Sequence, residues 1–254
     1  MTIVLVHGNP ETDAIWEDLR SYLEDLDVVA LSPPGFGAPV PDGFGATSDE
    51  YVTWLIAEVE QLAAPIDLVG HDWGGGHVCR AVAARPDLVR SWATDIAGCF
   101  DPEYVWHERA QVWQTPGAGE AAIAQQVATP SERLVAFYQG LGMSRAAAER
   151  RAVAMNEDMG RCILALYRSA AQPKMARWGA ELDRLRLRPG LVIIPTEDHY
   201  TGGEALARRT AERVGAQVAV LAGLSHWWMC QDPRRGADVL RSFVAGLATP
   251  SASA

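Results

Sequence analysis

The chain has 254 residues, of which 48% are hydrophobic and 21% are charged, the balance of a globular protein with a sizeable core. It carries 22 basic and 32 acidic side chains, a net charge of −10, and no basic block, which argues against nucleic acid or a membrane surface as partner. No apolar run reaches the ~18 residues of a membrane span. The four cysteines lack metal-ligand spacing, so we expect reduced thiols in the cytoplasm and neither metal nor cofactor.

Short apolar runs alternate with longer amphipathic stretches along the chain. This is the pattern of a parallel β-sheet with crossover helices, and runs so uniformly apolar indicate strands buried on both faces. Six strands are predicted, at residues 3–6, 28–31, 66–69, 92–96, 191–194 and 218–221. Helices are predicted between them, at 15–26, 47–62, 75–84, 204–214 and 233–247. Thr47 and Glu50 have the spacing of a capping box at the start of the second helix.

The alternation stops between residues 100 and 188, where helical patterns continue without a convincing strand. A structureless loop of ~90 residues would be unusual inside a compact domain, so we predict an all-helical insertion. The expected organisation is therefore a core domain of residues 1–99 and 189–254, with a helical cap at 100–188. The polar tail at 249–254 is expected to fray.

One glycine-rich turn follows the third predicted strand directly and leads into a helix. Asp72 lies at its centre, with Gly70 two residues before and Gly74 two residues after. This is the spacing of a nucleophile elbow, with aspartate in the position that is more often serine, and small neighbours allow such a tight turn. A phosphate-binding loop is disfavoured because the Gly-Lys-Ser/Thr signature is missing. An aspartate that only caps the following helix is the other alternative.

Partners for this turn follow three other strands. The His-Gly-Asn-Pro motif at 7–10 follows the first strand, where backbone N–H groups can face the elbow. His226 follows the last strand, at the edge of the sheet from which a base reaches the elbow. Asp198 follows the strand before it and is the predicted orienting acid, with Glu197 and Asp101 as alternatives. The order nucleophile, acid, histidine is that of the α/β-hydrolase fold.

These motifs resemble those of the α/β-hydrolase superfamily, in the aspartate-nucleophile branch that contains epoxide hydrolases and haloalkane dehalogenases. The resemblance covers almost the whole chain, and its motifs are His-Gly-Asn-Pro at 7–10, Pro-Gly-Phe-Gly at 34–37, His-Asp-Trp-Gly at 71–74, Asp198 and His226. It implies an α/β fold with a mostly parallel, doubly wound sheet and an inserted helical cap. Because the family usually begins with two more strands, about six strands are expected here.

The resemblance also implies a mechanism. Asp72 would attack a saturated carbon and form an alkyl ester. His226, oriented by Asp198, would then deprotonate the water that cleaves this ester. The backbone N–H groups of Asn9 and Trp73 would stabilise the resulting oxyanion.

Two segments favour an epoxide as substrate. Residues 112–120 and the residues around Tyr167 resemble cap segments of epoxide hydrolases, which implies that Tyr167 donates a proton to the epoxide oxygen. The expected place of a second cap tyrosine falls near Arg109, and Tyr104 or Tyr138 could substitute for it. The leading hypothesis is a hydrolase that opens a small hydrophobic epoxide to a diol. Its partners would be that substrate and water, and the protein would be a monomer or homodimer.

Two alternatives stay open. Asn9 and Trp73 match the halide-binding pair of haloalkane dehalogenases, and some members of this fold bind ligands without turnover. The pocket is expected to be lined by Tyr104, Trp106, Trp113, Tyr138 and Trp227. The remaining histidines, His7, His71, His77, His107 and His199, are expected to pack, to form hydrogen bonds or to lie at the surface, but not to act as the base.

Overall fold

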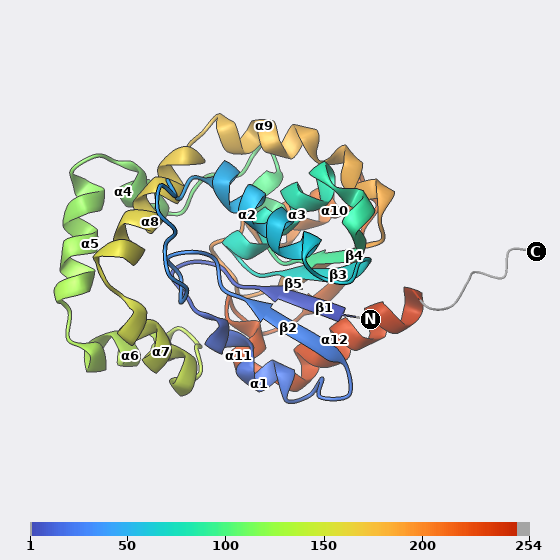
Figure 1. Ribbon diagram of the computed structural model, residues 1–254, viewed down its shortest axis with the longest axis horizontal. Coiled ribbons are helices and arrows are strands. Elements are labelled where there is room, and N and C mark those ends of the chain that lie inside the picture. The colour runs from blue at the N-terminus through green and yellow to red at the C-terminus, as the bar shows by residue number, and fades with distance from the viewer. Residues whose placement is uncertain (1, 248–254) are drawn as a thin grey trace, which may run out of the picture.

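The computed structural model describes residues 2–247 and has a single β-sheet at its centre (Figure 1). All its neighbouring strands are parallel, in the order β2-β1-β3-β4-β5-β6. The strands are β1 (Thr2–Val6), β2 (Asp27–Leu31), β3 (Ile66–Gly70), β4 (Val89–Thr94), β5 (Gly190–Pro195) and β6 (Gln217–Leu221). The prediction of an α/β fold with about six strands is confirmed, while the tail at 249–254 lies outside the described residues.

Burial along the strands explains why their sequences are so apolar. Every residue of β3 and β5 is buried, whereas β2 and β6 form the two edges of the sheet and are partly exposed. Alternate residues of β1 face two separate cores: Ile3 and Leu5 belong to one, and Val4 and Val6 to the other. A parallel sheet covered on both faces needs this two-sided apolar pattern.

Helices cover both faces of the sheet. In Figure 1, α2, α3 and α10 lie on one face, and α1, α11 and α12 lie on the other. Their bounds are α1 (Glu17–Arg20), α2 (Ser48–Glu60), α3 (Trp73–Ala84), α10 (Gly203–Val214), α11 (Trp228–Gln231) and α12 (Pro233–Leu247). In the part of the chain that the structure describes, none of the helices combines the length and apolar character that crossing a bilayer requires.

Two predicted boundaries are wrong. The helix expected over 15–26 is only a 3₁₀ turn (Asp13–Trp16) followed by α1, because from Tyr22 onward the backbone makes i→i−3 turn bonds. The strand expected over 92–96 is β4, which begins at Val89 and ends at Thr94, since Asp95 turns its carboxylate toward His71. The capping box is present: the Thr47 hydroxyl oxygen accepts from the backbone N–H of Glu50, at the start of α2.

The chain between β4 and β5 consists of helices joined by turns and loops and contains no strand, as predicted. It contains α4 (Glu108–Gln114), α5 (Ala118–Ala128), α6 (Ser131–Gly140), α7 (Arg145–Ala154), α8 (Glu157–Ser169) and α9 (Lys174–Glu181). Helices α4 to α8 gather at one end of the sheet, at the left of Figure 1. Helix α9 instead packs on α3, where the guanidinium of Arg80 lies 4.0 Å from the Trp178 ring. The division into a core and a cap at residues 99/100 and 188/189 stays a prediction.

The strand order fixes where a site can form. The chain passes from β1 outward to β2 and then returns to β3 on the other side of β1, so the strand order reverses between β1 and β3. Ligands of open α/β sheets bind at such a switch point, beyond the carboxyl ends of the strands. Here the loops after β1 and β3 carry the His-Gly-Asn-Pro motif and Asp72, respectively.

Candidate active site

Asp72 lies at the apex of a strained turn between β3 and α3. Its backbone has φ 48° and ψ −130°, in the left-handed half of conformational space that residues other than glycine rarely adopt. The turn closes because its neighbours lack side chains. A Cβ on Gly74 would lie 2.2 Å from the carbonyl oxygen of Val6, and one on Gly70 would lie 2.5 Å from the carbonyl oxygen of Gly74. The turn therefore requires glycine at positions 70 and 74.

The Asp72 carboxylate points into a cradle of backbone donors. Its Oδ1 atom accepts the backbone N–H of Asn9 at 2.9 Å. Burial raises the pKa of Asp72 to about 6, whereas the positive charge of His226 and the backbone N–H of Trp73 act in the opposite direction. The carboxyl group is therefore mainly ionised above pH 6, with the N–H groups of Asn9 and Trp73 directed at it.

His226 and Asp198 form a buried pair next to this carboxylate. Nδ1 of His226 donates to Oδ2 of Asp198 at 2.8 Å, and Nε2 lies 3.7 Å from Oδ2 of Asp72. Burial is the largest influence and disfavours the imidazolium, but the charge of Asp198, its hydrogen bond and the charge of Asp72 together raise the pKa of His226. Asp198 also accepts the backbone N–H of Tyr200 at 2.8 Å, which fixes the carboxylate in place.

The other acidic candidates do not reach this histidine. Asp101 binds the Arg209 guanidinium through both carboxylate oxygens, each at 2.9 Å. Glu197 is exposed, and so is His199, the neighbouring histidine that was not expected to act as the base. Among these three carboxylates, Asp198 is thus the one that the structure places against His226.

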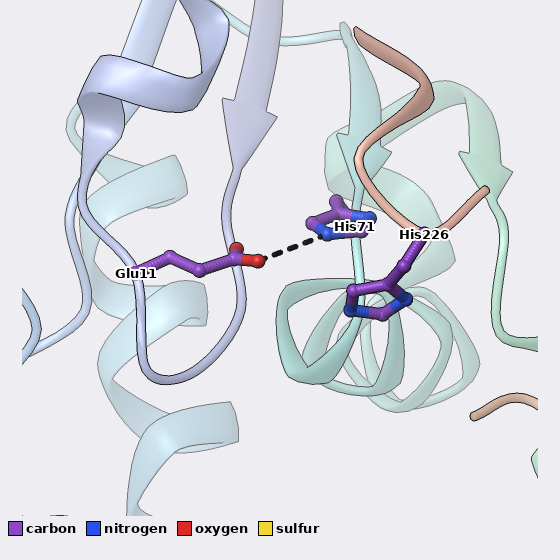
Figure 2. A group of neighbouring side chains, drawn as sticks. All are labelled: Glu11, His71 and His226. Atoms are coloured by element: carbon purple, nitrogen blue, oxygen red, sulfur yellow. Dashed lines mark hydrogen bonds and ion pairs between the residues drawn. The ribbon is translucent and has the colours of Figure 1, made fainter. Parts of the chain in front are cut away.

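His71 links the site to two further carboxylates. Figure 2 shows Glu11 reaching from the loop after β1 toward the His71 ring, with His226 beside it. His71 Nε2 lies 3.2 Å from Oε1 of Glu11, and Nδ1 lies 2.5 Å from Oδ2 of Asp95. Burial disfavours a charge on His71, but these two carboxylates raise its pKa well above the ordinary value. Carboxylates at both ring nitrogens thus favour the imidazolium form of His71, which donates a hydrogen bond at each nitrogen.

Three of these side chains lie close enough together to be considered as a metal site. One ligand atom each of Glu11, His71 and His226 lies within 4.8 Å of the others, a spacing that could hold an ion. A protonated imidazole has no free lone pair, however, and His71 uses both ring nitrogens on carboxylates. Glu11 in addition accepts the Trp227 indole N–H at 2.5 Å. The side chains of this group already form hydrogen bonds with one another, and His71 in this state offers no lone pair. The group therefore does not fit a metal ion.

Two small cavities, of about 30 Å³ and about 20 Å³, lie beside Asp72. His107, Tyr167 and Tyr200 line both of them. The five predicted pocket residues are divided between the two cavities: Trp113, Tyr138 and Trp227 line the larger, and Tyr104 and Trp106 the smaller. The cavities are of the size of one or two water molecules, so a substrate must displace side chains to enter.

Tyr167, on α8, faces Asp72 from the helical insertion. It is 2% exposed, and its ring packs on those of Trp73 at 5.3 Å and Trp113 at 4.8 Å. Burial raises the pKa of Tyr167 well above its ordinary value, and the nearby charge of Asp72 raises it further. The phenol therefore keeps its proton. Tyr104 is less suited to donate, because its hydroxyl already donates to the carbonyl oxygen of Tyr200 at 2.9 Å.

His107 is the site residue that the sequence did not reveal. Its Nδ1 accepts the backbone N–H of Ala110 at 3.2 Å, so the neutral ring carries its hydrogen on Nε2. Burial lowers the pKa of His107 to about 4, which keeps it neutral at physiological pH. His77 was predicted, like His107, to have no catalytic role. It stacks on Tyr51, with the two ring centres 5.0 Å apart, and lines neither cavity. His107 differs from His77 in lining the cavities, and this difference arises only from the way in which the insertion folds.

A carboxylate on a strained elbow, a histidine–aspartate pair and two backbone donors thus meet at the carboxyl edge of a doubly wound sheet. This combination defines a hydrolase of the α/β type. The chain belongs to the alpha/beta hydrolase family, whose model matches residues 3–239.

Solved structures share the fold over nearly the whole chain. A loop variant of a haloalkane dehalogenase from Bradyrhizobium elkanii has a TM-score of 0.72 and 19% identity, covering 98% of this chain and 91% of its own. A mutant protein from Pseudomonas aeruginosa, described as an epoxide hydrolase and crystallised with bound MFA, has a TM-score of 0.79 and 20% identity, with coverages of 97% and 89%. At such identities the likeness shows the fold alone.

A curated relative is similar over a shorter stretch. The (E)-2-((N-methylformamido)methylene)succinate hydrolase of Acinetobacter baylyi is 28% identical over 93 residues, which are 36% of this chain and 35% of that protein. The match thus spans about a third of the length of this relative.

Proposed function

We propose that this chain is a hydrolase that opens a small epoxide to a diol through an ester on Asp72. One observation carries the choice of an epoxide: Tyr167 and His107, two hydrogen-bond donors from the helical insertion, line both cavities beside Asp72. An epoxide oxygen stays on the substrate after ring opening and becomes a strongly basic alkoxide. It therefore needs a proton donor opposite the nucleophile.

In the first half of the reaction, an Asp72 carboxylate oxygen forms a bond to an epoxide carbon as the ring C–O bond breaks. The electron pair of that bond moves to the ring oxygen, which takes the phenolic proton of Tyr167. The Nε2 hydrogen of His107 stabilises the same oxygen without being transferred. The product of this half is an alkyl ester on Asp72 and a tyrosinate on Tyr167.

In the second half, His226 takes a proton from water, and the hydroxide attacks the carboxyl carbon of the Asp72 ester. The backbone N–H groups of Asn9 and Trp73 stabilise the oxyanion. Collapse breaks the ester bond and leaves a carboxylic acid on Asp72, whose proton passes to the departing alkoxide and restores the Asp72 carboxylate. The proton on His226 returns through water to the tyrosinate, so one epoxide and one water yield one diol.

Haloalkane hydrolysis is the second candidate. The Asn9 side-chain amide is buried without a hydrogen-bond partner among the described residues and lines the larger cavity, where it could bind a halide. Trp73, the other member of the expected halide pair, lines only the smaller cavity. Since these two donors line different cavities, the pair supports a halide site less well than Tyr167 and His107 support an epoxide.

The similar proteins are consistent with either substrate. Their names include a haloalkane dehalogenase and an epoxide hydrolase, so the family supports a hydrolase without choosing between them. The Acinetobacter baylyi relative is named for a succinate derivative, and its match covers too little of either chain to carry that substrate over. Cytoplasmic location and a monomeric or homodimeric state stay predictions.

One panel of small epoxides and haloalkanes tests the proposal. We expect Tyr167→Phe to lower diol formation by about 10²-fold, because it removes a general acid, and to leave any halide release nearly unchanged. Trp73→Phe removes an indole N–H and should lower halide release more than diol formation. The readouts are chromatography of the diol and titration of free halide.

Two other outcomes would reject the proposal that the substrate is an epoxide. Halide release that depends on Trp73 but not on Tyr167, with no diol formed, would establish the dehalogenase. Binding of the same compounds without any product would identify a non-catalytic binding protein.

A further inference from the structure

Arg109, on α4, lines the larger cavity together with Asp72. Its guanidinium forms no ion pair with any carboxylate among residues 2–247, although the chain has ten more acidic than basic side chains. Its neighbours are aromatic: the Phe137 ring centre lies 5.2 Å away and that of Trp113 lies 6.0 Å away. A half-buried cation at the active site thus has no anionic partner within the described protein.

The Arg109 charge acts on other side chains that line this cavity. Burial raises the pKa of Tyr200, and the Arg109 charge is the largest influence that opposes this rise. Burial also lowers the pKa of His107, and the charges of His226 and then Arg109 lower it further. Tyr200 and His107 both line the cavity at Asp72.

Tyr138 provides a second, independent observation. The side chain is 1% exposed and lines the same cavity, and its hydroxyl is buried without a hydrogen-bond partner among the described residues. Its ring lies 4.1 Å from the guanidinium of Arg151, a buried arginine that also forms no ion pair there. Buried hydroxyls nearly always find a partner, so an orphaned one on a cavity wall indicates a place for a ligand acceptor.

We propose that Arg109 and Tyr138 form a carboxylate subsite beside the nucleophile, so that the substrate is a small epoxide carrying a carboxylate group. The epoxide part of this statement rests on the proposed function, whereas the carboxylate part rests on the subsite alone. The guanidinium presents paired N–H donors that match the two oxygens of a carboxylate, and the phenol supplies a third donor. Negative charge on Asp72, Asp198 and Glu11 would repel an anion that lacked this counter-charge.

A wider cleft adjoins the subsite. A cleft of about 610 Å³ lies between α4, α5 and α6. Arg109, Trp113 and Tyr138 line both this cleft and the cavity at Asp72. The Arg109 guanidinium therefore lies where it can contact an anion in the cleft as well as one in the cavity.

The test compares two epoxides of nearly the same shape, glycidate and its neutral amide, glycidamide. Ring opening by Asp72 and hydrolysis of the ester convert glycidate and water into glycerate, with no other reactant. We expect wild type to show a kcat/KM at least 10-fold higher for glycidate. Arg109→Gln should lower kcat/KM for glycidate by about 10- to 100-fold, mainly through KM, and should leave glycidamide within about 2-fold. Tyr138→Phe should have a smaller effect in the same direction, and Arg109→Lys should retain part of the preference.

Arg177 gives the matched control. It is exposed on α9 and lines neither the cleft nor the cavity, so Arg177→Gln should leave both substrates unchanged. Equal kcat/KM for the two epoxides in wild type, or equal losses in Arg109→Gln, would overturn the subsite and leave the epoxide hydrolase intact.

Binding measurements separate the two proposals if neither epoxide is opened. Calorimetry with glycerate and glyceramide needs no turnover. Preferential binding of glycerate that Arg109→Gln abolishes would support the subsite even though the epoxide chemistry had failed. Equal or absent binding of both would overturn the subsite as well.

Discussion

Nε2 of His226 lies 3.7 Å from Oδ2 of Asp72, which is longer than a hydrogen bond, while Nδ1 of the same ring holds Asp198 at 2.8 Å. A serine nucleophile would have to give its proton to the histidine through a direct hydrogen bond. A carboxylate nucleophile has no proton to give, so its histidine needs no direct hydrogen bond to it and can act on water instead. The separation therefore fits a base that works only on the ester.

His226→Gln should stop the reaction after the ester has formed. The variant keeps the Asp72 carboxyl group and Tyr167, but no base is left to activate water. Because the His226 charge lowers the pKa of Asp72, the incubation is run well above pH 6 so that Asp72 is ionised. Intact-protein mass spectrometry after incubation with an epoxide should show an increase equal to the mass of one substrate, located on Asp72 by peptide mapping. A single burst of substrate consumption without sustained diol formation should accompany it.

Asp72→Ala combined with His226→Gln is the control. Removing the carboxylate should abolish the mass increase, since no nucleophile is left. An adduct that persists in the double variant would place the nucleophile elsewhere, and multiple turnover by His226→Gln would exclude His226 as the base.

His107→Leu should slow ring opening by about 10-fold, because it removes the Nε2 hydrogen that stabilises the epoxide oxygen. His107→Gln, which keeps an N–H donor on a side chain of similar length, should recover part of the loss. The measurement is the single-turnover rate of ester formation in the His226→Gln background. His199→Gln, at an exposed position, is the control and should change nothing. If His107→Leu forms the ester at the unaltered rate, His107 has no role in ring opening, and Tyr167 alone acts on the epoxide oxygen.

The elbow and its partners could be predicted because local spacing and strand order determine them. The two glycines around Asp72 are what a tight strand-to-helix turn needs, and the positions of Asp198 and His226 after the last two strands place them at the same edge of a parallel sheet. Neither inference needs tertiary contacts beyond the sheet itself.

The residues that the sequence did not reveal depend on packing between distant elements. His107 and Arg109 reach the cavity because α4 and α8 lie at one end of the sheet, and nothing in the residues around them distinguishes them from surface positions. Glu11, His71 and Asp95 come together from the loops after β1, β3 and β4. Likewise, the helix expected over 15–26 has the right periodicity but ends early in turns.

Asp198→Asn should change both the rate and the pH dependence of ester hydrolysis. Burial alone would lower the pKa of His226, and it is chiefly Asp198 that raises it. Without that charge, the histidine should lose its proton at a lower pH, so the acid limb of the profile should move downward in pH. The maximal rate should fall by about 10²- to 10⁴-fold, since the ring loses its orientation and the imidazolium its stabilisation.

The decay of a preformed ester on Asp72 should be followed across pH, because this isolates the step from the ionisation of Asp72 itself. Glu197→Gln is the matched control at the adjacent, exposed carboxylate, and its profile should equal that of wild type. A profile that does not move in Asp198→Asn would assign the orientation of His226 to another group.

Asp72→Asn should stabilise the fold above pH 6. Burial raises the pKa of Asp72 from 3.8 to about 6, so the folded state disfavours its charge. This penalty is absent below about pH 4, grows as the pH rises through the interval up to 6, and is constant above it. A difference of about two pKa units corresponds to at most about 3 kcal/mol, which the uncharged amide should recover at neutral pH.

Urea unfolding at pH 4 and pH 8 measures this difference in the free energy of unfolding, with mass spectrometry to verify that the amide is intact. Asp42→Asn, at an exposed position, should show no such dependence. Equal stability of Asp72→Asn and wild type at pH 8 would mean that the cradle of backbone donors fully compensates the buried charge.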